Sequence, residues 1–384
     1  MNLLSRDIDQ ITDLMNFRTY QYGLIYDFIK ICFEYINRFG FECDNYSIEI
    51  LQDKTYHSTN HYAFDKLRIK LDDGGKQNFL ELDIPKLIDG MFFKLKGVYY
   101  VPLIYILDEP ITFKKSSIKL NSLFRPITLY LNDNRVILNG HNIPVSRFLR
   151  LYSPDENTTK EVCELFKTQY IQESLDESVY NISKLVLCEN DLESLIEFIE
   201  DTFFDNWTKG LYQAYYKKKN MNMMGIFEVI VDRLINNQHV EFNDLAHKRL
   251  VFIELLLDPL FKSINRFITN LRRNPDQTQI PIKANAIIQH FYLSGNIGIG
   301  IQKKNRGLSG SNLYSIVNGF SGLLGLKGSF ENPKSQSELP RAVSSIHPNY
   351  KGKICPVTIS NKNPGVISTL VPDQKIDLKY GLFL

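Results

Sequence analysis

The sequence predicts an α+β fold in which helices are mixed with antiparallel sheets. Apolar residues recur at helical spacing near the N-terminus, over residues 8–39. From there to about residue 145, short apolar runs alternate with turn residues, a pattern typical of antiparallel strands. From 158 to 240 apolar stripes at helical spacing return. The length of 384 residues suggests two or three domains.

The first helix is expected to end where its apolar pattern stops. Gly40 follows at that point, and glycine commonly caps the C-terminus of a helix. Three strand pairs are expected next, each with turn residues between two apolar runs: 67–82 around DDGGKQ, 91–107, and 127–140 around NDN. Strands joined by such short turns run in opposite directions, so these pairs predict antiparallel sheets.

The second helical region carries two amphipathic stripes, at 193–207 and 225–236. Between them, the run 217–219 of three lysines ends a tyrosine-rich stretch. A solvated helix end is expected there in preference to a phosphate-binding patch.

The last third begins with the longest helical pattern, at 244–273, which Pro259 is expected to kink or divide. From Ser294 onward glycine, proline and serine crowd the chain, so loops threaded between short elements are expected. Loops of that length in a compact protein are usually functional or held by a partner.

Composition excludes several classes of protein. The net charge is only +2, so any contact with DNA or RNA must be local or shared with a partner. The 5 cysteines include no CxxC pair and the 7 histidines are dispersed, so no zinc site is expected. No apolar run approaches membrane-spanning length, so no membrane contact is expected. Gly295, Gly298 and Gly300 lack the spacing of a nucleotide-binding loop.

Residues 346–370 carry a specific pattern, IHPNYKGKICPVTISNKNPGVISTL. It resembles a loop of the β-type large subunits of multisubunit DNA-dependent RNA polymerases, V-H-P-T-H-Y-G-R-x-C-P-x-E-T-P-E-G-x-N-x-G-L-I-x-x-L. Lys353 takes the place of the family's arginine, and residues 358–362 replace its acidic E-T-P-E-G core. The matching residues are His347, Pro348, Gly352, Cys355, Pro356, Gly365, Ile367 and Leu370.

Further segments resemble the same family in the same order along the chain. EFNDLAHKRL at 241–250 resembles D-R-D-H-Y-G-K-K-R-L, and SGNIGIGIQKK at 294–304 resembles T-G-N-W-G-x-Q-K-K. Residues 311–328 align on the segment that lines the RNA path in bacterial enzymes, and 82–101 resembles the I-P-I-M region. Tyr380-Gly381 matches a Y-G-F motif. Ordered matches from separate parts of a chain are stronger evidence than any single match.

The resemblance implies a domain organisation. It implies the first part of the protrusion at 1–110, a shortened lobe at 111–240, the return of the protrusion at 241–293, and the start of the fork with hybrid-channel loops at 294–384, continued by a separate chain. Such a chain would form the wall of the DNA cleft and of the RNA–DNA hybrid channel.

The resemblance also implies that this chain alone is inactive. The family's two active-site lysines lie beyond the matched residues, and its β′-type subunit binds the catalytic Mg²⁺, so no catalytic residue and no cofactor are expected here. The implied partners are a C-terminal β fragment, β′-like fragments, a promoter-specificity subunit as an option, the DNA template and the RNA transcript. Split subunits of this kind occur in jumbo bacteriophages of the phiKZ type. The non-virion enzyme, in the cytoplasm of the infected bacterial host, is expected, with the virion enzyme as the alternative.

The same alignment identifies candidate site residues. The expected contacts with nucleic acid are Lys303, Lys304, Asn312, Lys327, Arg341, Lys353 and Asn363. The expected structural loop residues are His347, Cys355, Pro356 and Gly365, with Cys355 buried in packing. Lys303 and Lys304 are equally consistent with solvated side chains or with pairs to a partner subunit. Two alternatives of another class stay open: a non-catalytic nucleic-acid-binding protein with the same fold, and an inhibitor that mimics the polymerase.

Overall fold

The computed structural model describes much of the chain, and the structural statements below concern that part. The described residues are 16–38, 45–51, 64–73, 76–87, 93–95, 98–100, 104–113, 117–123, 126–130, 135–138, 141–143, 156–165, 179–182, 185–188, 200, 203–219, 221–236, 244–254, 260–261, 279–282, 322–325, 346–355, 367–371 and 374–384.

The chain forms two compact units. Unit 1 combines Met1–Leu107 with Phe242–Leu384, and unit 2 is the continuous stretch Asp108–Glu241. Unit 2 thus spans nearly the residues expected for the domain at 111–240, while the identity of that domain as a lobe stays a prediction. Both units combine helices with small sheets, so the α+β class is confirmed. None of the helices in the described ranges is long and apolar enough to cross a membrane.

The first described element of unit 1 is a helix with one buried stripe of apolar side chains. Residues 16–23 are helical, Leu24 lies in a turn, and α2 (Ile25–Arg38) continues from it. The backbone N–H of Phe28 donates to the carbonyl oxygen of Leu24 at 2.9 Å, so the two stretches join almost directly. The buried apolar side chains recur at helical spacing: Phe17, Ile25, Phe28, Ile29, Cys32 and Phe33. The helix expected at 8–39 is confirmed over 16–38, and the rest of that range and Gly40 lie outside the described residues.

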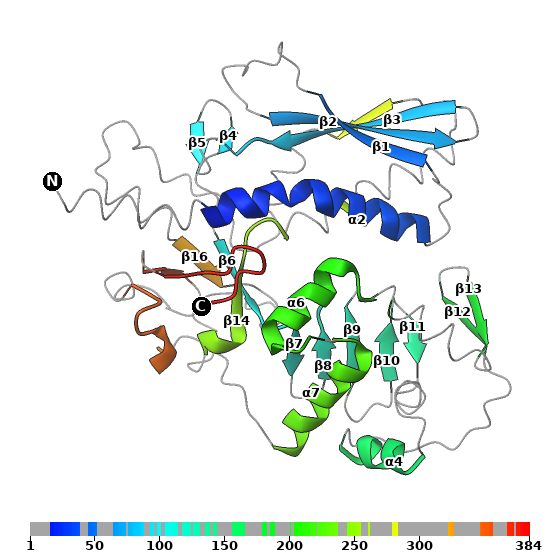
Figure 1. Cartoon of the computed structure of the whole chain (residues 1–384), viewed down its shortest axis with the longest axis vertical. Helices are drawn as coiled ribbons and strands as arrows, with labels where there is room; N and C mark the ends of the chain where they lie inside the picture. Colours follow the sequence, from blue (N-terminus) through cyan, green and yellow to red (C-terminus); the bar gives the residue numbers. More distant parts are fainter. Residues whose placement is uncertain are drawn as a thin grey trace, which may run out of the picture. The chain divides into compact units, whose positions relative to one another are not determined.

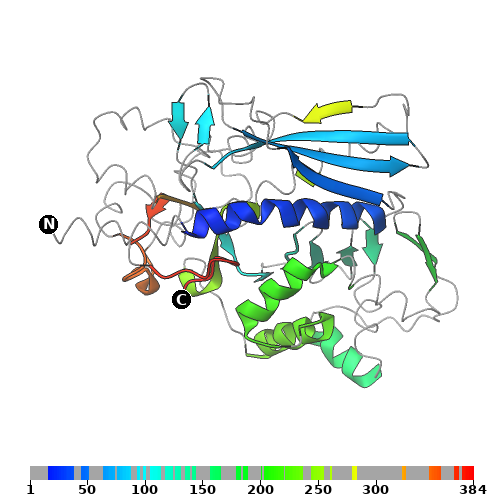
Figure 2. The same cartoon turned by 45° about the horizontal axis from the view of Figure 1, so that its top comes forward.

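A four-stranded sheet accompanies this helix, in the order β1-β2-β3-β15. Its strands are β1 (Asn45–Leu51), β2 (Phe64–Asp73), β3 (Lys76–Pro85) and β15 (Gln279–Ile282). The expected hairpin is confirmed, because β2 and β3 pair antiparallel with Leu67 opposite Leu82 and Ile69 opposite Leu80. All four side chains are buried, so one face of the hairpin is apolar. Figures 1 and 2 both draw α2 along one face of this sheet.

The second sheet of unit 1 has the order β14-β6-β16-β17. Its strands are β14 (Lys248–Val251), β6 (Ile104–Asp108), β16 (Gly322–Gly325) and β17 (Ile367–Thr369). The expected strand pair at 91–107 is confirmed as the hairpin of β4 (Phe93–Leu95) and β5 (Val98–Tyr100), followed by β6. Two pairings are parallel, β15 with β3 and β16 with β6, so the sheets are not purely antiparallel as expected.

The helix expected at 244–273 is wrong at its start. Asp244 caps a single 3-10 turn, η1 (Leu245–His247), and the chain then enters β14. Three of the four residues of β14 are buried, and a short buried run of this kind has no periodicity that separates strand from helix. The pairing of β14 with β6 in the sheet therefore determines that this run is a strand. Pro259 lies outside the described residues.

Unit 2 is built on a five-stranded antiparallel sheet of order β11-β10-β9-β8-β7. Its strands are β7 (Ile111–Phe113), β8 (Ser117–Leu120), β9 (Ile127–Tyr130), β10 (Arg135–Leu138) and β11 (His141–Ile143). The expected pair at 127–140 is confirmed as β9 and β10. The other elements are α4 (Glu156–Leu165), α6 (Asn206–Tyr216), α7 (Met223–Ile235) and a hairpin of β12 (Val179–Ile182) and β13 (Leu185–Cys188). That hairpin corrects the expectation that 158–240 is helical throughout, because VYNI and LVLC favour extended backbone.

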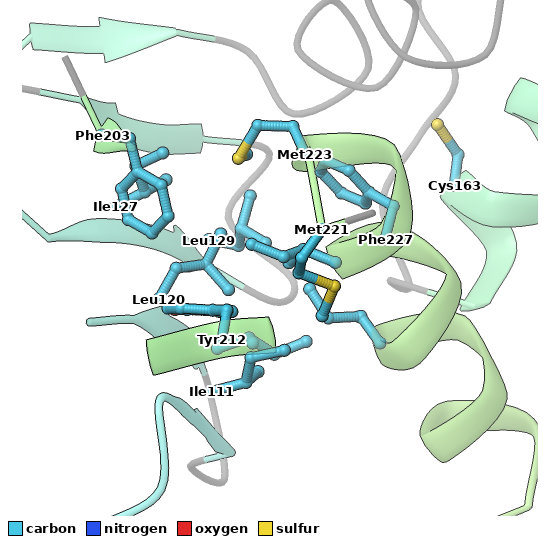
Figure 3. Close-up of a cluster of buried hydrophobic side chains, with 13 residues drawn as sticks. Ile111, Leu120, Ile127, Leu129, Cys163, Phe203, Tyr212, Met221, Met223 and Phe227 are labelled. Carbon is cyan, nitrogen blue, oxygen red and sulfur yellow. The ribbon is translucent and has the colours of Figure 1, made fainter. Parts of the chain in front are cut away.

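The core of unit 2 lies between this sheet and its helices (Figure 3). Figure 3 shows Ile111, Leu120, Ile127 and Leu129 of the strands facing the aromatic and sulfur-containing side chains of the helical part. Tyr212 is fully buried, and its hydroxyl donates to the carbonyl oxygens of Pro110 and Asn121, both at 3.1 Å. The ring therefore joins the core while its polar tip stays hydrogen-bonded.

Helix ends in unit 2 are set by polar caps. The Asp205 carboxylate accepts the backbone N–H of Thr208 at 2.9 Å, so α6 starts at Asn206 and the helix expected at 193–207 does not run through to 207. Lys217 adopts the left-handed conformation that ends α6, with φ of 54°. Lys217 and Lys219 are exposed, so the predicted solvated helix end is confirmed. The stripe expected at 225–236 is confirmed as α7.

A buried ion pair ties α7 to the start of the sheet. The Arg233 guanidinium donates to both Glu109 carboxylate oxygens, at 2.7 and 2.8 Å, and the Tyr215 hydroxyl donates to the same carboxylate at 3.3 Å. Arg233 also lies over the rings of Phe113 and Tyr216, at 5.4 and 6.0 Å. Burial acts to lower the pKa of Arg233, but the hydrogen bonds and charge of Glu109 outweigh it and raise that pKa.

Candidate functional site

Three of the candidate site residues lie in the described part of the chain: His347, Lys353 and Cys355. The others lie outside it: Lys303, Lys304, Asn312, Lys327, Arg341, Pro356, Asn363 and Gly365. The three described residues belong to one segment, the His347 loop, defined as residues 346–355. The candidate site is therefore built around this loop in unit 1.

The His347 loop begins with a capped 3-10 turn, η4 (Pro348–Tyr350). A proline opens the turn, where its fixed φ fits and its missing N–H is not needed. The Nδ1 atom of His347 accepts the backbone N–H of Asn349 at 3.2 Å, which caps the turn. The loop ends where Ile354 forms an antiparallel bridge with Leu370. The His347 side chain thus caps the turn, and its role as a structural loop residue of the family stays a prediction.

Two turns that lie far apart in the sequence meet at Asp244. Its carboxylate accepts the backbone N–H of Ala246 at 2.8 Å and the side-chain N–H of Asn349 at 2.5 Å. His347 Nδ1 lies 3.8 Å from one carboxylate oxygen, and His247 Nε2 lies 3.9 Å from the other. We call these five residues the Asp244 junction. It joins η1 to η4 through one acceptor.

The Asp244 junction is an anionic centre. Burial acts to raise the pKa of Asp244, but the hydrogen bonds from Ala246 and Asn349 and the charges of the two histidines outweigh it, so its pKa is lowered. Burial, and then the charge of Asp244, raise the pKa of the Tyr350 hydroxyl. An ionised carboxylate that is already hydrogen-bonded holds the two turns together and would repel a phosphate. Among the described residues no group of three His, Cys, Asp or Glu side chains is placed to hold a metal ion.

A second close contact joins β14 to the C-terminal segment. The backbone N–H of Leu250 donates to the carbonyl oxygen of Gly381 at 2.8 Å, and Arg249 forms an antiparallel bridge with Leu382. Gly381 has φ of +70°, and a Cβ atom on it would lie 1.8 Å from the carbonyl oxygen of Leu250. Only glycine permits this approach.

The arginine of the same strand is committed to an internal pair. Both guanidinium nitrogens of Arg249 donate to the Glu254 carboxylate at 2.6 Å, and the two side chains are only 7% and 8% exposed. This bidentate pair satisfies the two terminal nitrogens of Arg249, whereas its buried Nε has no hydrogen-bond partner among the described residues. Arg249 therefore supports β14 and does not present its charge to a ligand.

Lys353 is the one expected nucleic-acid contact that the described residues include. Its carbonyl oxygen accepts the backbone N–H of Val371 at 2.8 Å. Its ammonium lies over the ring of Phe383, 5.3 Å from the centroid. This cation–π contact orients the side chain without neutralising its charge. Cys355 is partly exposed, which corrects the expectation that it is buried in packing, because the loop leaves the bridge at Ile354 and reaches the surface.

The candidate site residues did not include Asp244, Asn349 or Gly381, which assemble the site, although each lies in a segment that resembles the family. A local signal existed for Asp244, since aspartate before a short apolar turn is a common N-cap. No local signal pairs it with Asn349, which lies more than a hundred positions later. No protein-family model matches this chain, and no curated protein matches it.

Proposed function

We propose that this chain is the N-terminal part of a β-type large subunit of a multisubunit DNA-dependent RNA polymerase. One observation carries the proposal: three segments that resemble the family at separate places in the sequence lie against one another in unit 1. Their described parts are 244–250, 346–355 and Tyr380-Gly381, joined by hydrogen bonds of 2.5 and 2.8 Å. Chance resemblances have no physical reason to meet in space, whereas residues that build one packed site do.

In this proposal the chain forms walls of the nucleic-acid channel and supplies charged side chains, but it supplies no catalytic residue. Unit 1 corresponds to the protrusion with the start of the fork, and unit 2 to the shortened lobe. Phosphodiester synthesis needs metal ions that activate the 3′-hydroxyl and stabilise the leaving pyrophosphate, and a β′-like partner would hold the Mg²⁺. The chain would line the DNA cleft and the hybrid channel in the cytoplasm of an infected bacterium or within a virion.

The test is to express the chain with an affinity tag in its native host and to identify what co-purifies. We expect recovery, in fixed stoichiometry, of polypeptides that resemble the rest of β and the β′ subunit, together with magnesium-dependent RNA synthesis. A matched control carries Gly381→Val, which should detach the C-terminal segment from β14 and so lose partners that depend on this face.

Two results would contradict the proposal. Recovery of the tagged chain alone would favour a non-catalytic nucleic-acid-binding protein. Recovery with the host polymerase alone, and inhibition of its transcription, would favour a polymerase-mimicking inhibitor.

A further inference from the structure

We propose that the Lys351-Gly352-Lys353 turn and the neighbouring Lys375 bind the sugar–phosphate backbone of a nucleic acid. We call these four residues the lysine surface. The inference deepens the proposed function and rests on it for the identity of the ligand, an RNA–DNA hybrid. The phosphate-binding surface itself is argued from geometry and charge.

The turn offers backbone as well as side chains to a ligand. Gly352 has φ of +75°, and nothing lies within 4 Å of the Cβ atom that another residue would carry there. Lys351 and Gly352 are exposed. A glycine beside open space lets a phosphate approach the main chain closely, and a lysine stands on each side of it.

Hydrogen bonds to preceding residues fix the backbone of the turn. The backbone N–H groups of Lys351 and Lys353 donate to the carbonyl oxygens of Pro348 and Tyr350, at 3.1 and 3.0 Å. Tyr350 is buried beneath the turn, 5% exposed. A rigid turn loses little conformational entropy when a ligand binds, so more of the contact free energy remains as affinity.

Phe383 links this turn to Lys375. The Lys353 ammonium lies over the Phe383 ring, and Phe383 forms an antiparallel bridge with Ile376, the residue after Lys375. The carbonyl oxygen of Lys375 accepts the backbone N–H of Leu384 at 3.1 Å, which fixes the backbone at Lys375. The Lys375 side chain is exposed.

Most charged side chains around the turn are lysines. In the described residues 346–355 and 374–384, Asp377 is the one acidic side chain, against four lysines. Asp244 also lies against this loop, where its carboxylate is hydrogen-bonded to Asn349. The Asp377 carboxylate accepts the backbone N–H of Lys379 at 3.0 Å, so it caps its own turn. No ion pair involves Lys351, Lys353 or Lys375 within the described part of the chain. Their charges are available to a polyanion, which gains affinity by releasing counterions.

The experiment measures binding of the full chain to a fluorescently labelled RNA–DNA hybrid by anisotropy across a range of salt concentrations. The test variant carries Lys351→Gln, Lys353→Met and Lys375→Gln; methionine keeps the packing on Phe383 and removes the charge. The control carries Lys217→Gln, Lys218→Gln and Lys219→Gln at the end of α6. Both variants lower the net charge by the same amount on different surfaces. Duplex DNA replaces the hybrid in a parallel series.

We expect the test variant to bind the hybrid about tenfold more weakly or worse at low salt. Its plot of log K against log salt should be shallower by about 3, because each lost phosphate contact removes about 1 from the slope. The control should match the unmodified protein. Weaker binding to the hybrid than to duplex DNA in the unmodified protein would contradict the hybrid as ligand.

Equal losses in both variants would overturn the inference, since net charge alone would then explain binding. An unchanged test variant would overturn it as well. If Lys353→Met lowers the melting temperature, the double variant of Lys351 and Lys375 replaces it, with an expected slope change of about 2. The proposed function is tested separately, by co-purification of partner subunits. A chain that binds the hybrid through these lysines but recovers no partner subunits would contradict the proposed function and leave the lysine surface supported.

Discussion

At the scale of single residues, two glycines in the left-handed conformation differ in what surrounds them. Gly381 approaches the carbonyl oxygen of Leu250 so closely that a Cβ atom would lie 1.8 Å from it, whereas Gly352 faces open space. We expect Gly381→Ala to destabilise the protein by at least about 3 kcal/mol, because the C-terminal segment must move away from β14. Urea denaturation followed by circular dichroism measures this change.

Gly352→Ala is the matched control for that prediction. It carries the same backbone cost, about 1 kcal/mol, without the steric overlap. The difference between the two variants therefore isolates the contact with Leu250. Equal destabilisation by the two substitutions would show that the contact between Gly381 and β14 contributes nothing.

Asp244 predicts a specific dependence of stability on pH. Its pKa is lowered in the folded chain, so as the pH falls the unfolded chain takes up the proton first. The stabilisation is complete above the unfolded pKa of about 4 and is lost as the pH falls through the folded value. Asp244→Asn should be less stable by about 1 kcal/mol at neutral pH, and the difference should vanish in acid.

Denaturation of both proteins at a series of pH values measures this effect. Asp377→Asn is a suitable control, because that carboxylate also accepts a backbone N–H, in an exposed hydrogen bond within its own turn. A difference between Asp244→Asn and the unmodified protein that does not shrink as the pH is lowered through 4 and further into acid would count against the junction.

At the scale of elements, one ion pair fixes α7 against the start of β7 in unit 2. Glu109 and Arg233 are 5% and 12% exposed and share two hydrogen bonds. We expect Glu109→Gln to cost about 3 kcal/mol, because it leaves a buried guanidinium without its counter-charge. Thermal unfolding monitored at several wavelengths measures the loss.

The control pair lies on the same helix. Lys218 and Glu228 form an ion pair at 3.0 Å, with side chains 38% and 61% exposed. Glu228→Gln should cost less than about 0.5 kcal/mol, because solvent screens an exposed pair. A comparable loss from both substitutions would mean that burial does not set the strength of the pair at Glu109.

How far the sequence predicts these elements depends on how local their causes are. The hairpin of β2 and β3 follows from alternating side chains and a glycine-rich turn, all within a few residues. The strand β14 was not predictable in this way, because KRLV and the apolar residues after it fit a helix equally well. Its strand conformation depends on pairing with β6, whose residues lie far away in the sequence.

The same limit applies to the candidate site. The His347 loop could be singled out from its own residues, and its cap and proline follow from local rules. The contacts that give Lys353 its position come from Val371 and Phe383, and the contact that anchors the loop comes from Asp244. Sequence pattern identifies the loop, and long-range packing determines what the loop touches.

At the scale of the whole molecule, the chain leaves unit 1 at the end of β6 and returns shortly before β14. These two strands are neighbours in one sheet, so the chain departs from and returns to the same part of unit 1. Unit 2 is continuous in sequence and has its own buried core. Units inserted in this way commonly fold independently.

We therefore predict that residues 108–241 fold when expressed alone. The isolated unit should unfold in one cooperative transition, since its core, its caps and the pair of Glu109 with Arg233 are all internal. The sharper test repeats Glu109→Gln in the isolated unit. Its cost should agree with the cost in the full chain to within about 0.5 kcal/mol, because substitutions without partners elsewhere are additive. An isolated unit without a cooperative transition, or with a much smaller cost for this substitution, would show that unit 2 depends on unit 1 for its packing.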